Sequence, residues 1–204
     1  MQPKLSYSSA TPIDSVLVLV DMQKKFPAST DPAVIQACAN LITNHMRRQS
    51  PIIIAEFGDP KVILPPHSIH CGDTHRSLMD LLLFPRRYDK LAVVEKLCND
   101  GSAVILRECT NRGFATSAFR VCGVNSDACV SETVYGLAVR RHKSQIEVIT
   151  EACNTEGKSY NWRKDCWEPY NWNHFPALPN IVLVRPALTE PEAFMYPGNS
   201  VLRS

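Results

Sequence analysis

The sequence contains few glycines and no long apolar run, and these absences exclude several classes of protein. Only 8 of the 204 residues are glycine, and the first apolar run continues as DMQKKFP without a glycine-rich phosphate turn, which excludes a nucleotide-dependent dehydrogenase. No apolar run approaches the roughly 18–20 residues that cross a bilayer, and residues 1–14 lack the apolar core of a signal peptide. We therefore expect a cytoplasmic protein with no membrane partner.

Excess charge and paired cysteines are also missing. With 22 basic and 20 acidic side chains the formal net charge is +2, so we expect no nucleic acid partner. The 8 cysteines are scattered along the chain without the C-x-x-C spacing of zinc or dithiol sites. In a reducing compartment such cysteines are expected to be free thiols.

The residues that are present predict one domain over 1–204, since 45% are apolar and 21% charged. Short β-branched runs predict strands buried on both faces, at 16–20, 51–57, 91–95, 119–124, 146–150 and 181–185. Amphipathic segments between them predict helices, at 31–48, 74–83, 101–112, 128–141 and 156–167. Such alternation indicates an α/β three-layer sandwich with a mostly parallel six-stranded sheet.

Two segments do not follow this alternation and are expected to be loops over one end of the sheet. Residues 58–73 are proline-rich, and residues 160–179 hold all three tryptophans, Trp162, Trp167 and Trp172. Aromatic side chains of this kind cap pockets, build oligomer contacts or fill loops. The sequence leaves these roles open.

Three chemically active side chains follow predicted strands: Asp21, Lys96 and Cys129. Taken singly, they have ordinary interpretations as a capping acid, a surface charge and a packed thiol. In open α/β sheets, however, ligands bind at the carboxyl ends of the strands. A carboxylate, an ammonium and a thiol at that edge indicate nucleophilic catalysis.

The same places carry a family resemblance. The segments VLVLVDMQKKF, VVEKLCNDGS and VCGVNSDACVSETVYGLAVRR resemble the three signature segments of the isochorismatase-like cysteine hydrolases, which include the nicotinamidases. The similarity extends from about residue 15 to 155, and the third segment resembles the block G-V-x-[TS]-D-x-C-V at every fixed position. The resemblance implies a Rossmann-like, doubly wound α/β sandwich, in agreement with the strand and helix pattern.

The resemblance implies a catalytic triad of Asp21, Lys96 and Cys129. Asp21 would take the thiol proton and later activate water, and Lys96 would keep that carboxylate ionised. A helix N-terminus and a nearby cation lower the pKa of a thiol. We therefore expect a depressed pKa for Cys129.

Further residues receive roles from the same resemblance. The oxyanion hole would use the backbone amides of Asn125 and Cys129, after a cis peptide bond between Val124 and Asn125. Phe26 completes a D-x-Q-x-x-F pattern, and it would line the substrate ring pocket or pack in the core. Gln23 is expected to fix the local backbone.

The cysteine selects among the chemistries of the family, because members that cleave the vinyl ether of isochorismate generally lack it. We expect a cysteine-dependent hydrolase that cleaves an amide or another C–N bond of a small molecule through a thioester, as nicotinamidases do. Two alternatives are a family hydrolase of a carbamoyl compound or vinyl ether, and a non-catalytic scaffold. Proteins of this family are commonly oligomers, so we expect a homo-oligomer.

A metal site is a further question. PPHSIHCGDTHRSL resembles the nicotinamidase segment whose histidine binds a divalent metal together with an Asp-x-His pair. Here AEFGDPK supplies Asp59 without that second histidine. A divalent metal (Zn, Fe or Mn) near Asp59 and His70 is one option, with His67, Asp73 and His75 as further ligands. The other option is that no metal is bound.

Overall fold

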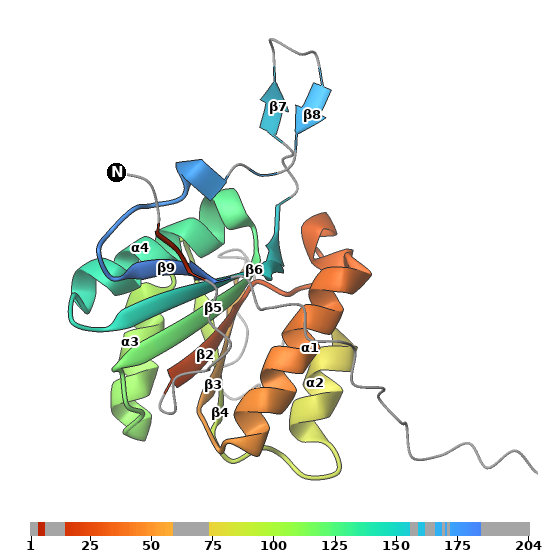
Figure 1. Cartoon of the computed structure of the whole chain (residues 1–204). Helices are drawn as coiled ribbons and strands as arrows, with labels where there is room; N and C mark the ends of the chain where they lie inside the picture. Colours follow the sequence, from red (N-terminus) through yellow and green to blue (C-terminus); the bar gives the residue numbers. More distant parts are fainter. Residues whose placement is uncertain are drawn as a thin grey trace, which may run out of the picture.

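Parallel strand pairing forms the middle layer of this protein. The computed structural model describes residues 4–6, 15–58, 74–155, 159–161, 166–168, 170 and 172–184. Its main sheet has seven parallel strands in the order β1-β9-β6-β5-β2-β3-β4. Helices α1 and α2 lie on one face of this sheet and α3 and α4 on the other, which gives three layers (Figure 1).

The predicted strands are confirmed. They are β2 (Ser15–Val20), β3 (Ile52–Phe57), β4 (Leu91–Lys96), β5 (Ala118–Val124), β6 (Gln145–Asn154) and β9 (Ile181–Val184). A seventh strand, β1 (Lys4–Ser6), pairs with β9 at the edge of the sheet. Sequence patterning missed it because its neighbours are polar and an edge strand needs no continuous apolar run.

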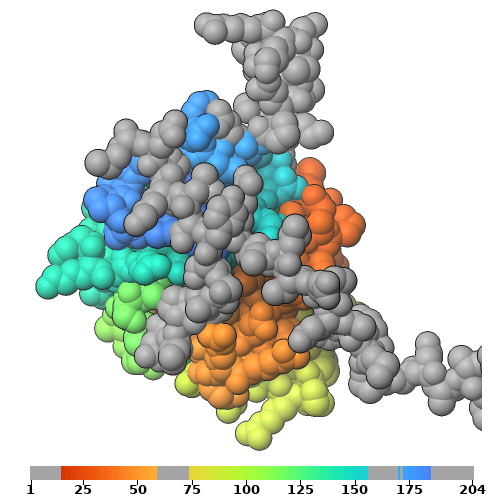
Figure 2. Space-filling view, viewed as in Figure 1, coloured from red at the N-terminus to blue at the C-terminus, as the bar shows by residue number. Residues whose placement is uncertain are grey.

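The helices between the strands also follow the prediction. They are α1 (Pro32–Arg47), α2 (Arg76–Leu83), α3 (Ser102–Arg112) and α4 (Ser131–Arg140). Helix α1 begins after a capping residue, Asp31, whose carboxylate accepts a hydrogen bond from the Ala33 amide at 2.9 Å. The surfaces of α1 and α2 adjoin in the lower part of the space-filling view (Figure 2). No helix in the described ranges is long and apolar enough to cross a membrane.

The predicted helix over 156–167 is wrong. Instead, β7 (Ser159–Asn161) and β8 (Cys166–Glu168) form an antiparallel pair in which Tyr160 lies opposite Trp167. Aromatic residues are enriched in strands, which agrees with this pairing. Two short 3-10 turns, η1 (Pro27–Thr30) and η3 (Trp172–His174), and a π-helical turn, η2 (Ser126–Val130), complete the described elements.

The core contains a buried histidine whose hydrogen bonds assign its tautomer. His45 of α1 is fully buried, and its Nδ1 lies 2.9 Å from the Leu41 carbonyl. A carbonyl only accepts, so Nδ1 carries the proton and Nε2 accepts from the Ser15 hydroxyl at 3.3 Å. Burial lowers the pKa of His45 from 6.5 to about 4.

This histidine makes the stability of the fold dependent on pH. Below pH 6.5 the unfolded chain binds a proton at His45, whereas the folded protein does not bind it until the pH approaches 4. The free energy of unfolding is therefore highest above pH 6.5 and decreases as the pH falls towards 4. We expect His45 to reduce the free energy of unfolding by about 2 kcal/mol between pH 7.5 and 5. Urea denaturation at both pH values measures this loss, and His45→Gln should lose about 2 kcal/mol less. Equal losses in both proteins would contradict the assignment.

Candidate active site

The structure brings the three predicted triad residues together at the carboxyl-terminal ends of the strands. Asp21 directly follows β2, Lys96 is the last residue of β4, and Cys129 lies in η2 (Ser126–Val130), the short turn after β5. In the sheet β5 neighbours β2, and β3 separates β2 from β4. Because all these strands are parallel, their carboxyl ends meet at the same edge.

Asp21 and Lys96 form a buried ion pair. Lys96 Nζ lies 2.8 Å from Asp21 Oδ2, and each side chain is only 1% exposed. Among the described residues, neither oxygen of the Asp21 carboxylate accepts a hydrogen bond of good geometry, so the contact with Lys96 is an ion pair. The Cys129 thiol and the charge of Lys25 also act on the pKa of Asp21.

The backbone around Asp21 is fixed from the neighbouring strand. Asp21 has a φ of 51°, in the left-handed region, and its amide donates to the Ala55 carbonyl at 2.9 Å. Gln23 holds the end of β3 by two hydrogen bonds: its Oε1 accepts from the Phe57 amide at 2.7 Å, and its Nε2 donates to the Phe57 carbonyl at 3.3 Å. Gln23 therefore has the backbone-fixing contacts expected of it.

Lys96 is enclosed by backbone and aromatic groups. Its Nζ donates to the Cys98 carbonyl at 3.2 Å and lies 4.6 Å from the centroid of the Phe57 ring. A Cβ added to Gly101 would lie 3.0 Å from Lys96 Cδ. These contacts hold the ammonium against the Asp21 carboxylate.

The turn that carries Cys129 begins with an unusual backbone. The Val124–Asn125 peptide bond is cis, as the family resemblance implied. The preceding Gly123 has a φ of 122°, and a Cβ there would lie 2.0 Å from the Val20 carbonyl oxygen of β2. Only glycine allows this approach. The Asn125 carbonyl then accepts hydrogen bonds from the amides of Ala128 and Val130, at 3.1 and 3.0 Å.

Side chains of the turn fasten it to the end of β6. Ser126 Oγ donates to the Asn154 carbonyl at 3.0 Å, and Thr155 donates to the Asp127 carboxylate. Ser126 and Asp127 thus have structural contacts that hold the turn against the residues at the end of β6. The use of the Asn125 and Cys129 amides as an oxyanion hole stays a prediction.

Burial dominates the protonation of the site. It raises the pKa of the Cys129 thiol to about 11, with a further rise from Asp21 and an opposing effect of Lys96. Burial also raises the pKa of Asp21 above its ordinary value, against the opposing effects of Lys96 and the thiol. The expected depressed pKa of Cys129 is therefore wrong: the thiol is only 5% exposed, and loss of hydration outweighs the cation.

Phe26 lies beside the site rather than in contact with the ion pair. Its partly buried ring packs edge to face against Phe57, with centroids 6.4 Å apart, and Phe57 in turn contacts the Lys96 ammonium. Lys25 Nζ lies 5.5 Å from the Phe26 ring centroid. Phe26 therefore packs against the core and also borders the site, and its contact with a substrate stays a prediction.

Four of the five candidate metal ligands, Asp59, His67, His70 and Asp73, lie outside the described residues. The fifth, His75, directly precedes α2, and its Nε2 lies 2.9 Å from Ser29 Oγ. The described residues contain no group of three side chains that could hold a metal ion. Metal binding stays a prediction.

Sequence reasoning missed Asn99, which contacts the thiol, and Glu132, which contacts Asn99. Cys129 Sγ lies 3.4 Å from Oδ1 of Asn99, and Asn99 Nδ2 donates to the Glu132 carboxylate at 2.9 Å. Asn99 stands three residues after Lys96, in the loop after β4. Its place after a strand was the available signal, but an asparagine in a loop is too common to stand out.

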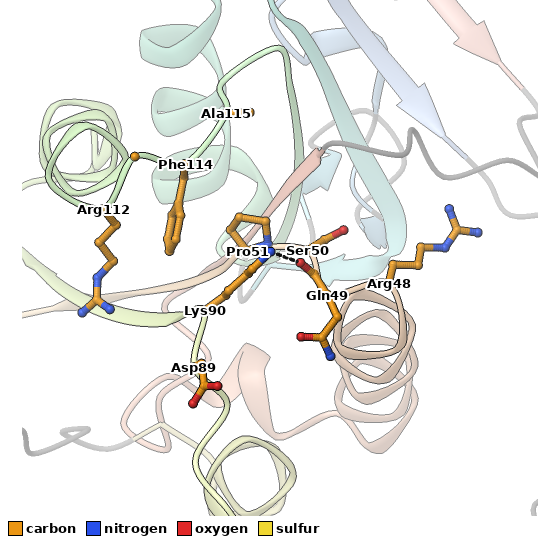
Figure 3. Close-up of a pocket in the computed structure, with 10 residues that line it drawn as sticks. Arg48, Gln49, Ser50, Pro51, Asp89, Lys90, Arg112, Phe114 and Ala115 are labelled. Carbon is orange, nitrogen blue, oxygen red and sulfur yellow. Dashed lines mark hydrogen bonds between the residues drawn. The ribbon is translucent and has the colours of Figure 1, made fainter.

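A cavity of about 640 Å³ lies at the opposite edge of the sheet, where β3 and β4 begin (Figure 3). Its charged lining residues are Arg48, Asp89, Lys90 and Arg112. Lys90 is engaged by the Gln49 carbonyl at 2.6 Å, and Arg112 by Glu108 at 2.6 Å. No cysteine or histidine is among its lining residues, so the end of the sheet that holds the triad is the better candidate.

No protein-family model and no curated protein matches this sequence. Solved structures do match the fold. An isochorismatase from Pseudomonas putida KT2440 has a TM-score of 0.60 and 19% identity, over 89% of this chain and 92% of that one. N-carbamoylsarcosine amidase from Thermoplasma acidophilum has a TM-score of 0.58 and 19% identity, over 87% and 99%.

A third match is the pyrazinamidase/nicotinamidase from Streptococcus mutans UA159, with a TM-score of 0.54 and 18% identity over 69% of this chain and 87% of that one. At these identities the matches establish the fold. The chain thus has the isochorismatase-like α/β fold, which confirms the fold class that the sequence predicted.

The close approach at Gly123 gives a test of the turn geometry. Gly123→Ala places a Cβ 2.0 Å from the Val20 oxygen, and we expect it to reduce the free energy of unfolding by more than about 4 kcal/mol. Gly113→Ala is the matched control, because Gly113 also has a positive φ of 66° but nothing within 4 Å of its added Cβ. It should cost only about 1–2 kcal/mol. Chemical denaturation measures both, and similar losses would refute the steric account.

Proposed function

We propose that this protein is a cysteine-dependent hydrolase that cleaves an amide or another C–N bond of a small molecule through a thioester. The observation that supports it is the buried Asp21–Lys96 ion pair beside the Cys129 thiol, at the carboxyl edge of a parallel sheet. Two of the structural neighbours described above are named as amidases, which agrees with C–N bond cleavage. The family resemblance of the three segments points the same way.

In the proposed first step Asp21 is the general base and Cys129 the nucleophile. The Asp21 carboxylate accepts the thiol proton while Sγ forms a bond to the substrate carbonyl carbon. The π electrons of that carbonyl move to its oxygen, which the amides of Asn125 and Cys129 would stabilise. Because the pKa of the thiol is raised, proton transfer accompanies attack, and the resting enzyme holds a neutral thiol.

The remaining steps regenerate the three side chains. The C–N bond breaks, the leaving nitrogen takes the proton from Asp21, and a thioester on Cys129 remains. Asp21 then accepts a proton from water as the water oxygen attacks the thioester carbonyl. The C–S bond breaks, Sγ recovers the proton from Asp21, and a carboxylic acid leaves.

Lys96 makes this exchange feasible in a buried site. Burial disfavours the carboxylate form of Asp21, and the ammonium at 2.8 Å opposes that effect. The aromatic pair of Phe26 and Phe57 next to the ion pair suits a flat substrate, which favours a nicotinamidase-like substrate class. A carbamoyl compound or vinyl ether is the alternative substrate, and a non-catalytic scaffold is the alternative function.

A small substrate panel separates these functions. We expect ammonia or amine release from at least one of nicotinamide, pyrazinamide and N-carbamoylated amines, assayed with and without a chelator, with isochorismate as the vinyl ether control. Loss of turnover on chelation would place a metal in the enzyme. Turnover of isochorismate alone would favour the vinyl ether alternative, and no turnover of any compound would favour the scaffold.

Substitution of the nucleophile tests the mechanism. Cys129→Ala should lower kcat/KM on the best substrate at least ~1000-fold, since the thioester cannot form. Cys109→Ala is the matched control, because Cys109 is another buried thiol, in α3, and is not among the groups that act on the pKa of Asp21 or Cys129. It should retain turnover. A Cys129→Ala enzyme as active as the Cys109→Ala enzyme would eliminate the cysteine mechanism.

The general base predicts an acidic limit to the activity. Attack requires the Asp21 carboxylate, whose pKa burial raises above its ordinary value of 3.8, so kcat/KM should fall with decreasing pH through a midpoint above that value. The pH profile of kcat/KM measures this midpoint. Full activity retained at pH 4 would argue against Asp21 as the base.

A further inference from the structure

Besides the ion pair, a second polar group lies next to the Cys129 thiol. Asn99 Oδ1 lies 3.4 Å from Cys129 Sγ, within the range of a sulfur hydrogen bond. Asn99 belongs to the loop between β4 and α3, so the contact joins two segments that are 30 residues apart in sequence. The thiol proton therefore has an acceptor other than Asp21.

Glu132 determines which end of the Asn99 amide faces the sulfur. The nitrogen and oxygen of an asparagine side chain have the same shape, and only their hydrogen bonds distinguish them. Asn99 Nδ2 donates to Glu132 Oε1 at 2.9 Å. An ionised carboxylate only accepts, so the nitrogen faces Glu132 and the oxygen must face Cys129.

The loop that carries Asn99 is firmly attached to α4. The Thr133 hydroxyl donates to the Asn99 carbonyl at 3.1 Å and accepts from the Gly101 amide at 2.9 Å. Arg140 of α4 pairs with Asp100 at 3.1 Å. These contacts fix the backbone of the loop and thereby hold Asn99 next to the thiol.

We propose that Asn99 is a positioning residue that holds the resting Cys129 thiol through its side-chain oxygen, in an orientation that Glu132 imposes. An acceptor beside the sulfur stabilises the S–H form and disfavours the thiolate. The pair thereby keeps the nucleophile neutral until a substrate promotes proton transfer to Asp21. This inference rests on the proposed function only for the role of Cys129 as nucleophile.

Replacing Glu132 should reverse the orientation of the amide. In Glu132→Gln the partner side chain both donates and accepts, so Asn99 can turn its Nδ2 towards the sulfur and donate to the thiolate. We expect alkylation of Cys129 at pH 8 to become about 10-fold faster, which corresponds to a fall of one unit in the thiol pKa. Asn99→Asp places a carboxylate beside the sulfur and should slow alkylation by a similar factor.

The measurement uses iodoacetamide and the full-length protein. Mass spectrometry of the peptide that contains Cys129 gives its alkylation rate from pH 6 to 10, separately from the other cysteines. The removal of a negative charge could by itself raise the rate, so Glu132→Gln is also measured in an Asn99→Ala background. If Glu132 acts through Asn99, its substitution should change the rate less than 2-fold there.

The outcomes are distinct. An equal acceleration by Glu132→Gln with and without Asn99 would overturn the inference, as would unchanged profiles in all variants. Glu108→Gln, in α3 with its partly exposed carboxylate paired with Arg112, controls for a general loss of negative charge and should leave the profile unchanged. Alkylation needs no substrate, so failure of the substrate panel would reject the proposed function without deciding the role of Asn99.

Discussion

The buried ion pair between Asp21 and Lys96 is the interaction on which the site depends. Both side chains are 1% exposed, and removal of either partner would leave an uncompensated charge in a protein interior. The pair can form only if the ends of β2 and β4 lie at one edge, and the Lys96 ammonium lies against Phe57 of the intervening β3 to reach Asp21. The parallel topology is thus a requirement of the chemistry.

Strand β2 links this pair to the nucleophile. Val20, its last residue, lies opposite Gly123 of β5, so the residue before Asp21 is also the one that excludes a side chain at Gly123. The chain of β5 passes close to β2 and then turns at the cis bond into the segment with Cys129. One close backbone approach therefore places the thiol on one flank of Asp21 and leaves the other flank to Lys96.

Much of this arrangement could be predicted from sequence, for physical reasons. Strands such as β2 and β5 are buried along their whole length, so they appear as continuous apolar runs, and the rule for strand ends then located the triad. Hydrogen bonds such as that of Asn99 to Cys129 depend on the path of a loop, which no periodicity encodes. The predicted direction of the pKa shift of Cys129 was wrong, because the sequence reveals the nearby cation but not how deeply the thiol is buried.

The raised pKa of the Cys129 thiol is compatible with the proposed chemistry and requires that the nucleophile is neutral before attack. A preformed thiolate beside the Asp21 carboxylate would put two anions against one ammonium in a poorly hydrated site, whereas a neutral thiol leaves the charges of Asp21 and Lys96 balanced. A proton passed from Cys129 to Asp21 during attack preserves that balance, because negative charge moves from the carboxylate through sulfur to the substrate oxygen. Burial, the ion pair and a neutral nucleophile are then consistent parts of one mechanism.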